Sequence, residues 1–262
     1  MPRVLNLLLS HQDPARISRM LAYWRGTLGM DDVLLAFGGP RDVFGQLHDG
    51  SCVFAGDPRM RTTDHQREKQ SYVAVFREAS HWMRGQDFTH VYFAEYDHIP
   101  LVDDLNERQL ARLESERADV LGHRVMRING TSFPHYLYHA SDPDFHRLWR
   151  RITCRPDPRI ILSMFGSGSF WTREAFDAVA CFEETVPIYL EVYLPTLAHH
   201  LGFRVRDFGE QNRYIGHLGN FAGKIGAARR DGAWTIHPVK TAWESKSTLL
   251  QTAQTTTASN PR

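Results

Sequence analysis

Two acidic residues follow a strongly apolar segment near the middle of the chain. Val91–Ala94 is apolar, and Glu95 and Asp97 come directly after it, separated by one residue. Carboxylate oxygens are hard ligands that suit Mg²⁺ or Mn²⁺. An ion held there could bridge to a diphosphate and neutralise the charge that develops on a leaving group. The same pair could also be a polar strand end without a ligand, because an acid-x-acid tripeptide is common.

A run of four small residues lies further along the chain. Gly166-Ser167-Gly168-Ser169 follows the apolar segment 159–165, and Thr172 is suited to cap the helix that comes next. Small residues let backbone amides approach a ligand closely. The run does not fit the G-x-S-x-G pattern of a serine nucleophile. It therefore predicts either a ligand-binding loop or a tight turn that binds nothing.

Alternating apolar and amphipathic segments predict the elements that position these residues. Val4–Leu9 is typical of a strand buried on both faces, and Asp13-Pro14 supplies the cap and first residue of a helix. The rest of the pattern predicts strands at 32–37, 52–55, 89–94, 119–122, 159–165 and 203–208, helices at 67–83, 103–116, 172–179 and 188–201, and irregular structure over 123–158. This alternation predicts an α/β fold with a mostly parallel central sheet flanked by helices. In such sheets ligands bind at the carboxyl ends of the strands, which is where Glu95 and Asp97 are expected.

The composition is that of one globular domain without a strong field. The chain has 262 residues, 42% of them hydrophobic, and a formal net charge of +1. We therefore expect no nucleic-acid partner. Residues 246–262 are rich in Ser, Thr and Gln without periodicity, and are predicted to be a disordered tail.

The cysteines and the apolar segments bear on the compartment. Cys52, Cys154 and Cys181 are odd in number and widely spaced, which favours a reducing compartment over a disulfide framework. No segment has the length and hydrophobicity of an integral membrane segment. These observations favour a cytoplasmic location.

The order of the motifs resembles that of GT-A glycosyltransferases. Glu95-Tyr96-Asp97 resembles their acid-x-acid signature, and the Gly/Ser run followed by Trp171 and Arg173-Glu174-Ala175-Phe176 resembles their donor and acceptor loop. The resemblance covers roughly residues 4–240, by motif order. It implies one GT-A-like, Rossmann-related domain over 1–245, with a nucleotide-binding half (about 1–100) and an acceptor half (about 101–245). The activity that it implies is transfer of a sugar from a nucleotide-diphosphate donor, with a UDP-sugar expected first, to a hydroxyl acceptor. Inversion and a Mn²⁺ or Mg²⁺ requirement are expected.

The resemblance also implies roles for individual residues. Asp97 and His237 would hold the metal, with His217 as an alternative to His237. Glu191, with Glu183 and Glu184 as alternatives, stands where inverting members place the catalytic base. The residues implied to bind the nucleotide sugar are Ser10, His11, Gln12, Phe37, Lys69, Glu95, Gly168, Ser169, Trp171 and Lys240. The Glu at position 95 departs from the family's Asp, so this side chain is expected on ribose or on a metal-bound water.

Other functions compete with this interpretation. A sugar nucleotidyltransferase usually carries a Gly-rich basic loop after its first strand, where this chain has Ser10-His11-Gln12-Asp13-Pro14. A catalytically silent binding or scaffold protein of the same fold would tolerate the Glu at position 95. A histidine-based metal enzyme could use His135 and His139, although Pro134 argues against a helical ligand pair.

Overall fold

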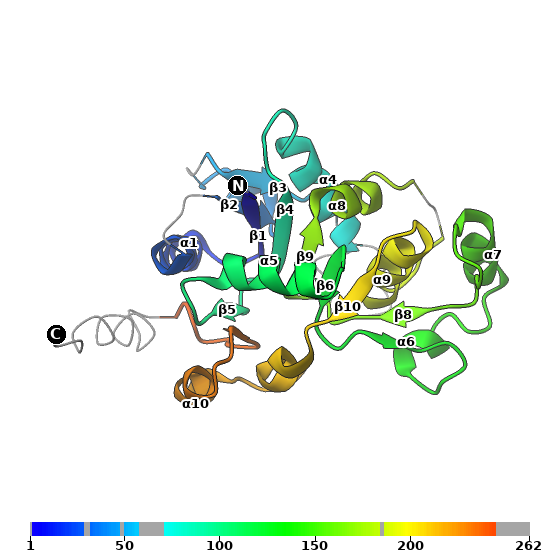
Figure 1. Cartoon of the computed structure of the whole chain (residues 1–262). Coiled ribbons are helices and arrows are strands. Elements are labelled where there is room, and N and C mark those ends of the chain that lie inside the picture. Colours follow the sequence, from blue (N-terminus) through cyan, green and yellow to red (C-terminus); the bar gives the residue numbers. More distant parts are fainter. Residues whose placement is uncertain (1, 29–31, 48–49, 58–70, 184–185, 245–262) are drawn as a thin grey trace.

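A seven-stranded sheet runs through the computed structural model, which describes residues 2–28, 32–47, 50–57, 71–183 and 186–244 (Figure 1). The strand order is β10-β6-β9-β4-β1-β2-β3. β9 is antiparallel to both its neighbours, and the other pairs are parallel. The predicted α/β class with a mostly parallel sheet is therefore confirmed. The strand bounds are β1 Val4–Ser10, β2 Val33–Phe37, β3 Cys52–Phe54, β4 His90–Glu95, β6 Val120–Gly122, β9 Ser169–Thr172 and β10 Val205–Asp207.

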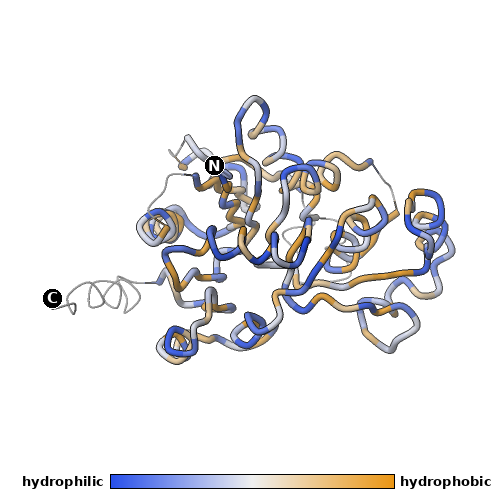
Figure 2. Tube along the Cα trace, viewed as in Figure 1, coloured by the Kyte–Doolittle hydropathy of each residue, from blue (hydrophilic) through white to orange (hydrophobic). Residues whose placement is uncertain are grey.

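Helices cover both faces of this sheet and enclose two apolar cores. Alternate side chains of β1 point to opposite faces: Leu5 and Leu7 join one core, and Val4 and Leu8 join the other. Figure 2 shows apolar residues along the central strands and hydrophilic residues on the outer turns of the helices. The helices are α1 Pro14–Leu28, α2 Arg41–Phe44, α4 Ser71–Trp82, α5 Leu105–Ser115, α6 Pro134–Leu137, α7 Pro143–Ile152, α8 Arg173–Ala180, α9 Leu190–His200 and α10 Ile225–Arg230.

Two of the helices begin at the capping residues that the sequence predicts, Asp13 and Thr172. Asp13 Oδ1 accepts a hydrogen bond of 3.0 Å from the Arg16 amide at the start of α1. Thr172 Oγ1 accepts one of 3.3 Å from the Ala175 amide at the start of α8. Each cap satisfies an amide that has no partner inside its helix.

Two predictions for the second half of the chain are wrong. The segment 123–158 was expected to be irregular, but it contains α6 and α7; Asp142 caps α7, and Phe145, Leu148 and Trp149 bury its apolar stripe. Of the strand expected at 159–165, only β8 Leu162–Ser163 forms, paired with β7 Met126–Arg127. The strand that enters the main sheet is β9, because its residues carry the large buried side chains.

The late part of the chain returns to the end of β4. β11 Thr235–Ile236 pairs with β5 Ile99–Pro100, just after the acidic motif. The Val239 amide donates to the Asp97 carbonyl at 2.9 Å. These backbone bonds place residue 237 beside residue 97. The predicted tail, 246–262, lies outside the described residues.

Candidate metal and catalytic site

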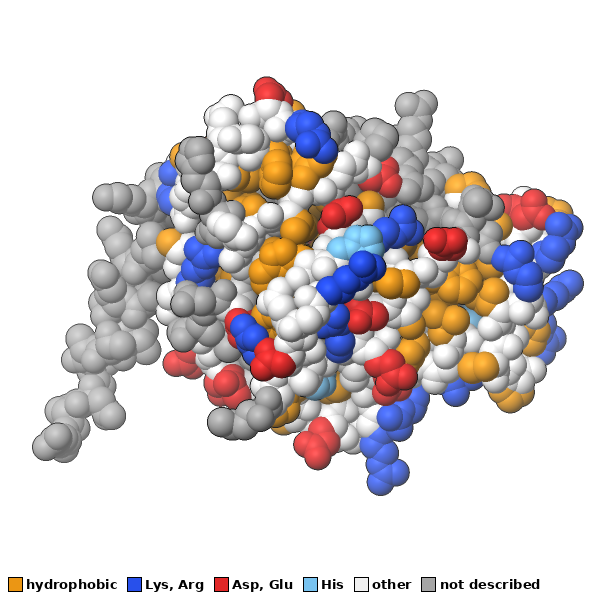
Figure 3. Space-filling model, turned by 90° about the horizontal axis from the view of Figure 1, so that it is seen from above, with side chains coloured by type: hydrophobic (Ala, Val, Ile, Leu, Met, Phe, Trp, Pro, Cys, Tyr) orange, Lys and Arg blue, Asp and Glu red, His pale blue; other side chains and the backbone are white. Residues whose placement is uncertain are grey.

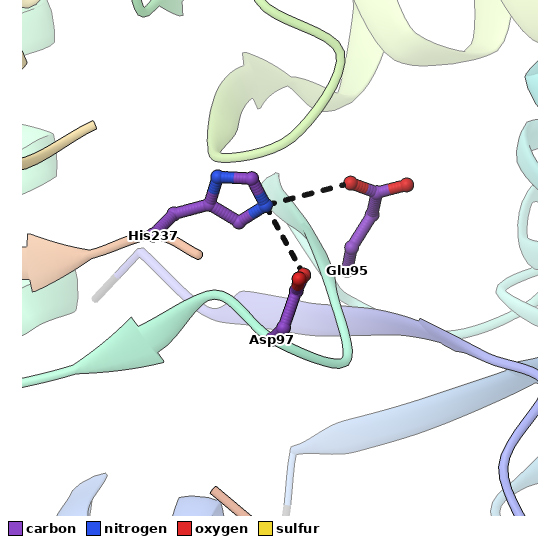
Figure 4. A group of neighbouring side chains, drawn as sticks. All are labelled: Glu95, Asp97 and His237. Atoms are coloured by element: carbon purple, nitrogen blue, oxygen red, sulfur yellow. Dashed lines mark ion pairs between the residues drawn. The ribbon is translucent and has the colours of Figure 1, made fainter. Parts of the chain in front are cut away.

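Three side chains from two distant parts of the chain converge at the end of β4. Glu95, Asp97 and His237 each offer a ligand atom, and these atoms lie within 4.8 Å of one another. His237 Nε2 is 3.1 Å from Asp97 Oδ1 and 3.8 Å from Glu95 Oε2 (Figure 4). His237 Nδ1 lies 3.1 Å from the Gly216 carbonyl oxygen, so Nδ1 donates the proton and Nε2 faces the carboxylates. Metal-binding histidines are oriented in this way.

The donor set fits a divalent cation. Two carboxylates and one imidazole suit Mn²⁺ or Mg²⁺ better than a soft metal. Asp97 is 5% exposed and His237 is 6% exposed. Burial lowers the pKa of His237, but its hydrogen bond to Asp97 and the charges of Asp97 and Glu95 leave that pKa raised overall. The negative charges of Asp97 and Glu95 therefore favour a positive charge between these side chains.

The Glu95 carboxylate is held by elements on either side of it. The Tyr72 hydroxyl on α4 donates to Glu95 Oε1. The Glu95 amide donates to Ser167 Oγ at 2.9 Å, and the same hydroxyl lies 3.2 Å from His98 Nδ1. The structure thus places Glu95 among the candidate metal ligands, rather than leaving it apart from them.

Glu191 lies on the first turn of α9, as predicted, and it is 8% exposed. Its Oε1 accepts from the Gly166 amide at 3.0 Å. Pro195 has no amide hydrogen, so the Glu191 carbonyl lacks its α-helical donor. The Met164 amide donates to that carbonyl at 3.0 Å instead. Pro195 lies inside α9, which begins at Leu190. The two hydrogen bonds from the Gly166 and Met164 amides connect Glu191 to the segment 164–166.

One cavity of about 360 Å³ joins these groups. Its wall contains all three candidate metal ligands, together with Glu191 and Lys240. The volume is at the low end of the range of small-molecule sites. The other lining residues are Tyr72, Tyr96, His135, Phe165, Gly166, Ser167, Tyr189, Leu190, His217, Leu218 and Pro238.

The residues predicted from the first two strand ends lie at the same edge of the sheet. Ser10 pairs with Phe37, and Leu9 with Glu95. The His11 ring packs edge-on against Tyr96 with ring centroids 5.0 Å apart. Ser10 and Phe37 are fully buried, so only the loops after them reach the surface.

One further predicted binding residue, Gln12, follows the end of β1. Gln12 Oε1 accepts from Arg16 at 2.9 Å, which holds the side chain against α1. Lys69 lies outside the described residues.

Of the alternatives for the base, Glu183 is exposed and Glu184 is outside the described residues.

Gly168, Ser169 and Trp171, three further predicted binding residues, are also packed inside the protein and do not line the cavity. Trp171 is fully buried, and its ring packs edge-on against Phe76 with centroids 5.4 Å apart. The Trp171 indole N–H donates to Ser169 Oγ at 2.8 Å. Gly168 has a φ of +79°, and a Cβ there would lie 2.2 Å from His98 Cε1. The second half of the small-residue run therefore serves packing, and its first half, Gly166 and Ser167, faces the cavity.

The structure also places residues whose role the sequence did not indicate. Tyr72 and Ser167 hold Glu95, but neither was a candidate. The metal pair of His135 and His139 is not formed, because His139 Nε2 accepts from the Tyr189 amide at 3.0 Å. His135 instead faces Glu191. Pro134, which argued against a helical metal pair, opens the short helix that carries His135.

A buried histidine cluster behind the site makes stability depend on pH. His123 Nδ1 lies 2.9 Å from Asn212 Oδ1, which also accepts from the Arg124 amide. Burial lowers the pKa of His123 to about 4, and burial also lowers that of His98 well below its ordinary value. The unfolded chain therefore binds protons between pH 6.5 and 4 that the folded chain does not bind.

We expect the free energy of unfolding to be fully supported above pH 6.5 and to fall as the pH drops to 4. His123 alone accounts for about 3 kcal/mol of this loss. Urea unfolding at pH 7.5, 5.5 and 4 measures the loss. His123→Asn is the comparison, because carboxylates titrate in both proteins. Equal losses in the variant and the wild type would show that His123 is not responsible.

The described residues carry no helix that is both long and apolar enough to cross a bilayer. On the face shown in Figure 3, acidic and basic side chains are largely interspersed. Cys52, Cys154 and Cys181 form no disulfide.

No protein-family model matches this chain, and no curated protein sequence matches it. Among solved structures, it is similar to the bifunctional IspDF of Campylobacter jejuni, with 9% identity and a TM-score of 0.43 over 80% of this chain and 50% of that one. It is also similar to the glucosyl-3-phosphoglycerate synthase of Mycobacterium tuberculosis, with 11% identity and a TM-score of 0.42 over 79% of this chain and 69% of that one. A third similar structure is the mannosyltransferase PcManGT of Pyrobaculum calidifontis in complex with GDP-Man and Mn²⁺. Its identity is 12% and its TM-score is 0.42, over 80% of this chain and 55% of that one.

The chain thus spans half the length of the first of these proteins and 55% of the third. These similarities concern the fold, and the chemistry of the cavity rests on its own residues.

Proposed function

We propose that the chain transfers a sugar from a nucleotide-diphosphate donor to a hydroxyl acceptor, with a divalent cation bound by Glu95, Asp97 and His237. The observation that supports this most is the convergence of these three ligands with a buried carboxylate, Glu191, in the wall of one cavity. A metal site alone would fit many functions. A metal site facing a proton acceptor across a cavity of sugar size fits group transfer.

The cation, when bound, would supply the positive charge that a departing diphosphate needs. Glu95, Asp97 and His237 hold it, and Ser167 and Tyr72 keep Glu95 in place. Lys240 is exposed at the cavity wall and adds a second positive charge for the phosphate oxygens. A side chain in the part of the cavity wall that contains Glu191 would accept the proton of the attacking hydroxyl. Attack from the side opposite the diphosphate would invert the anomeric configuration.

The donor's base would lie over the ends of β1 and β2. The loops after these strands begin at His11 and Gly38, at the same sheet edge as Glu95. His11 packs on Tyr96, which also lines the cavity. We expect a UDP-sugar to be the donor, with Mn²⁺ or Mg²⁺ as the ion.

A thermal-shift screen tests this function. The purified chain is heated with UDP, GDP, dTDP, UTP or CTP, each with Mn²⁺, with Mg²⁺ or with EDTA. A nucleoside diphosphate at about 100 times its Kd stabilises the folded state by about 2.7 kcal/mol, and we expect this only when the metal is present.

The other outcomes separate the alternatives. Stabilisation by a triphosphate but by no diphosphate would support a nucleotidyltransferase. Absence of any response to nucleotide or metal would contradict the proposal and support a silent scaffold.

A further inference from the structure

Each oxygen of the Glu191 carboxylate has a nitrogen atom close to it. Oε1 accepts from the Gly166 amide at 3.0 Å, and Oε2 lies 3.0 Å from His135 Nδ1. A carboxylate held in this way has little freedom to turn toward a substrate hydroxyl. Its position is that of a group which orients a neighbour.

The neighbour is His135, and only one of its two ring nitrogens faces Glu191. Its Nδ1 faces Glu191, and Nε2 makes no hydrogen bond within the described part of the chain. The side chain is 17% exposed and lines the cavity that holds the candidate metal ligands. The ring is braced by Tyr189, with ring centroids 4.4 Å apart.

His135 Nδ1 and Glu191 Oε2 are close together but do not form an aligned hydrogen bond. Catalytic hydrogen bonds are often poorly aligned before substrate binds and tighten in the complex. A small rotation of the ring brings Nδ1–H onto Oε2. The proton then sits on Nδ1, and the Nε2 lone pair is left as a base.

We propose that His135 is the general base of the transfer and that Glu191 is its positioning residue. This inference rests on the proposed function. The pair forms a carboxylate–imidazole dyad, in which the carboxylate fixes the tautomer and stabilises the imidazolium that forms. Imidazole is also better matched than a carboxylate to proton transfer near neutral pH.

The reaction balances with these groups. The acceptor hydroxyl gives its proton to His135 Nε2, and its oxygen forms a bond to the anomeric carbon. The bond from that carbon to the phosphate oxygen breaks, and its electron pair leaves with the nucleoside diphosphate. Glu191 faces the positive charge that results on the His135 ring.

Three titratable rings and one carboxylate surround His135 within the described part of the chain. The titratable groups that face it are Glu191 on α9, His217 after η2 (Gly209–Tyr214), and the rings of Tyr138 and Tyr189. Only Glu191 brings a negative charge. Glu191 is therefore the acceptor toward which His135 Nδ1–H is oriented.

Hydrolysis of the donor tests the assignment, with water as the acceptor. UDP-glucose, UDP-galactose, UDP-N-acetylglucosamine and GDP-mannose are incubated with Mn²⁺, and release of the nucleoside diphosphate is measured from pH 5 to 9. We expect His135→Ala and His135→Gln to lower kcat by about 10²- to 10⁴-fold with KM for the donor unchanged. Added imidazole should restore part of the activity of His135→Ala.

Glu191→Gln should lower kcat by less than His135→Gln does, because it removes the positioning carboxylate and leaves the base in place. Glu191→Asp should recover much of the loss. His81→Gln, on the exposed side of α4, is the matched control and should behave as wild type.

The outcomes distinguish the two proposals. If Glu191→Gln abolishes turnover while His135→Gln keeps it, or if imidazole restores nothing to His135→Ala, the dyad is overturned and Glu191 is the base. Each variant must keep the metal-dependent thermal shift with UDP, which shows that it folds and binds. If the wild type shows neither that shift nor hydrolysis, the proposed function itself fails.

Discussion

Asp97→Asn is expected to lower metal-dependent donor turnover by about 10³-fold, which corresponds to about 4 kcal/mol of transition-state stabilisation. The amide keeps the shape of the side chain but removes the charge of the most buried ligand, whose Oδ1 lies 3.1 Å from His237 Nε2. The Asp97 carbonyl still accepts from the Val239 amide, so the turn itself is retained. Nucleoside-diphosphate release in the presence of Mn²⁺ measures the loss.

The control for this variant is Asp103→Asn. Asp103 is exposed near the start of α5, and the same change of charge there should leave turnover and Mn²⁺ affinity unaltered. Calorimetric titration with Mn²⁺ and UDP separates a lost metal site from a lost fold. Unchanged metal affinity and turnover in Asp97→Asn would show that the ion, if one binds, lies elsewhere.

The sequence predicted the acidic half of this site because strand ends are local features. A continuous apolar run ends at Ala94, and the next polar residues must lie at the edge of the sheet. His237 was a weaker prediction, since nothing near it in the sequence shows that β11 pairs with β5. The pairing depends on the path of about 130 intervening residues, and a single sequence does not specify that path.

The main errors in the fold have a similar cause. The segment 159–165 is apolar enough for a strand, but an apolar run alone does not say which strand joins the sheet. β9 is only four residues long, and the small residues before it predict a turn that enters a helix. For α7 the signal was present: Asp142-Pro143 followed by Phe145, Leu148 and Trp149 has a cap and a helical apolar spacing.

The candidate base shows what spacing cannot reveal. Glu191 and His135 are far apart in the sequence, and their contact depends on α6 packing against α9. A histidine beside a proline gives no local sign of such a partner. The proposed dyad therefore gives Glu191 a different role from the one that the resemblance implies: it orients the base and is not the base itself.

Gly168→Ala is expected to destabilise the fold by about 4 kcal/mol. The backbone at Gly168 has a φ of +79°, a conformation that costs an L-residue about 1–2 kcal/mol. The added Cβ would also lie 2.2 Å from His98 Cε1 and 2.9 Å from His123 Cδ2. Both rings are buried and anchored by Ser167 and Asn212, so they cannot move aside cheaply. Overpacking of this kind adds about 1–3 kcal/mol.

Gly130→Ala is a matched control, because Gly130 has a φ of +74° but no atom within 4 Å of an added Cβ. It should therefore carry the backbone cost alone. The difference between the two variants in the free energy of urea unfolding isolates the clash with the two histidines. If both variants lost the same stability, the histidines behind the site would have room to yield, and Gly168 would be required only for the turn. A larger loss in Gly168→Ala shows instead that the rings supporting Ser167 and Glu95 form a rigid layer beneath the candidate metal site.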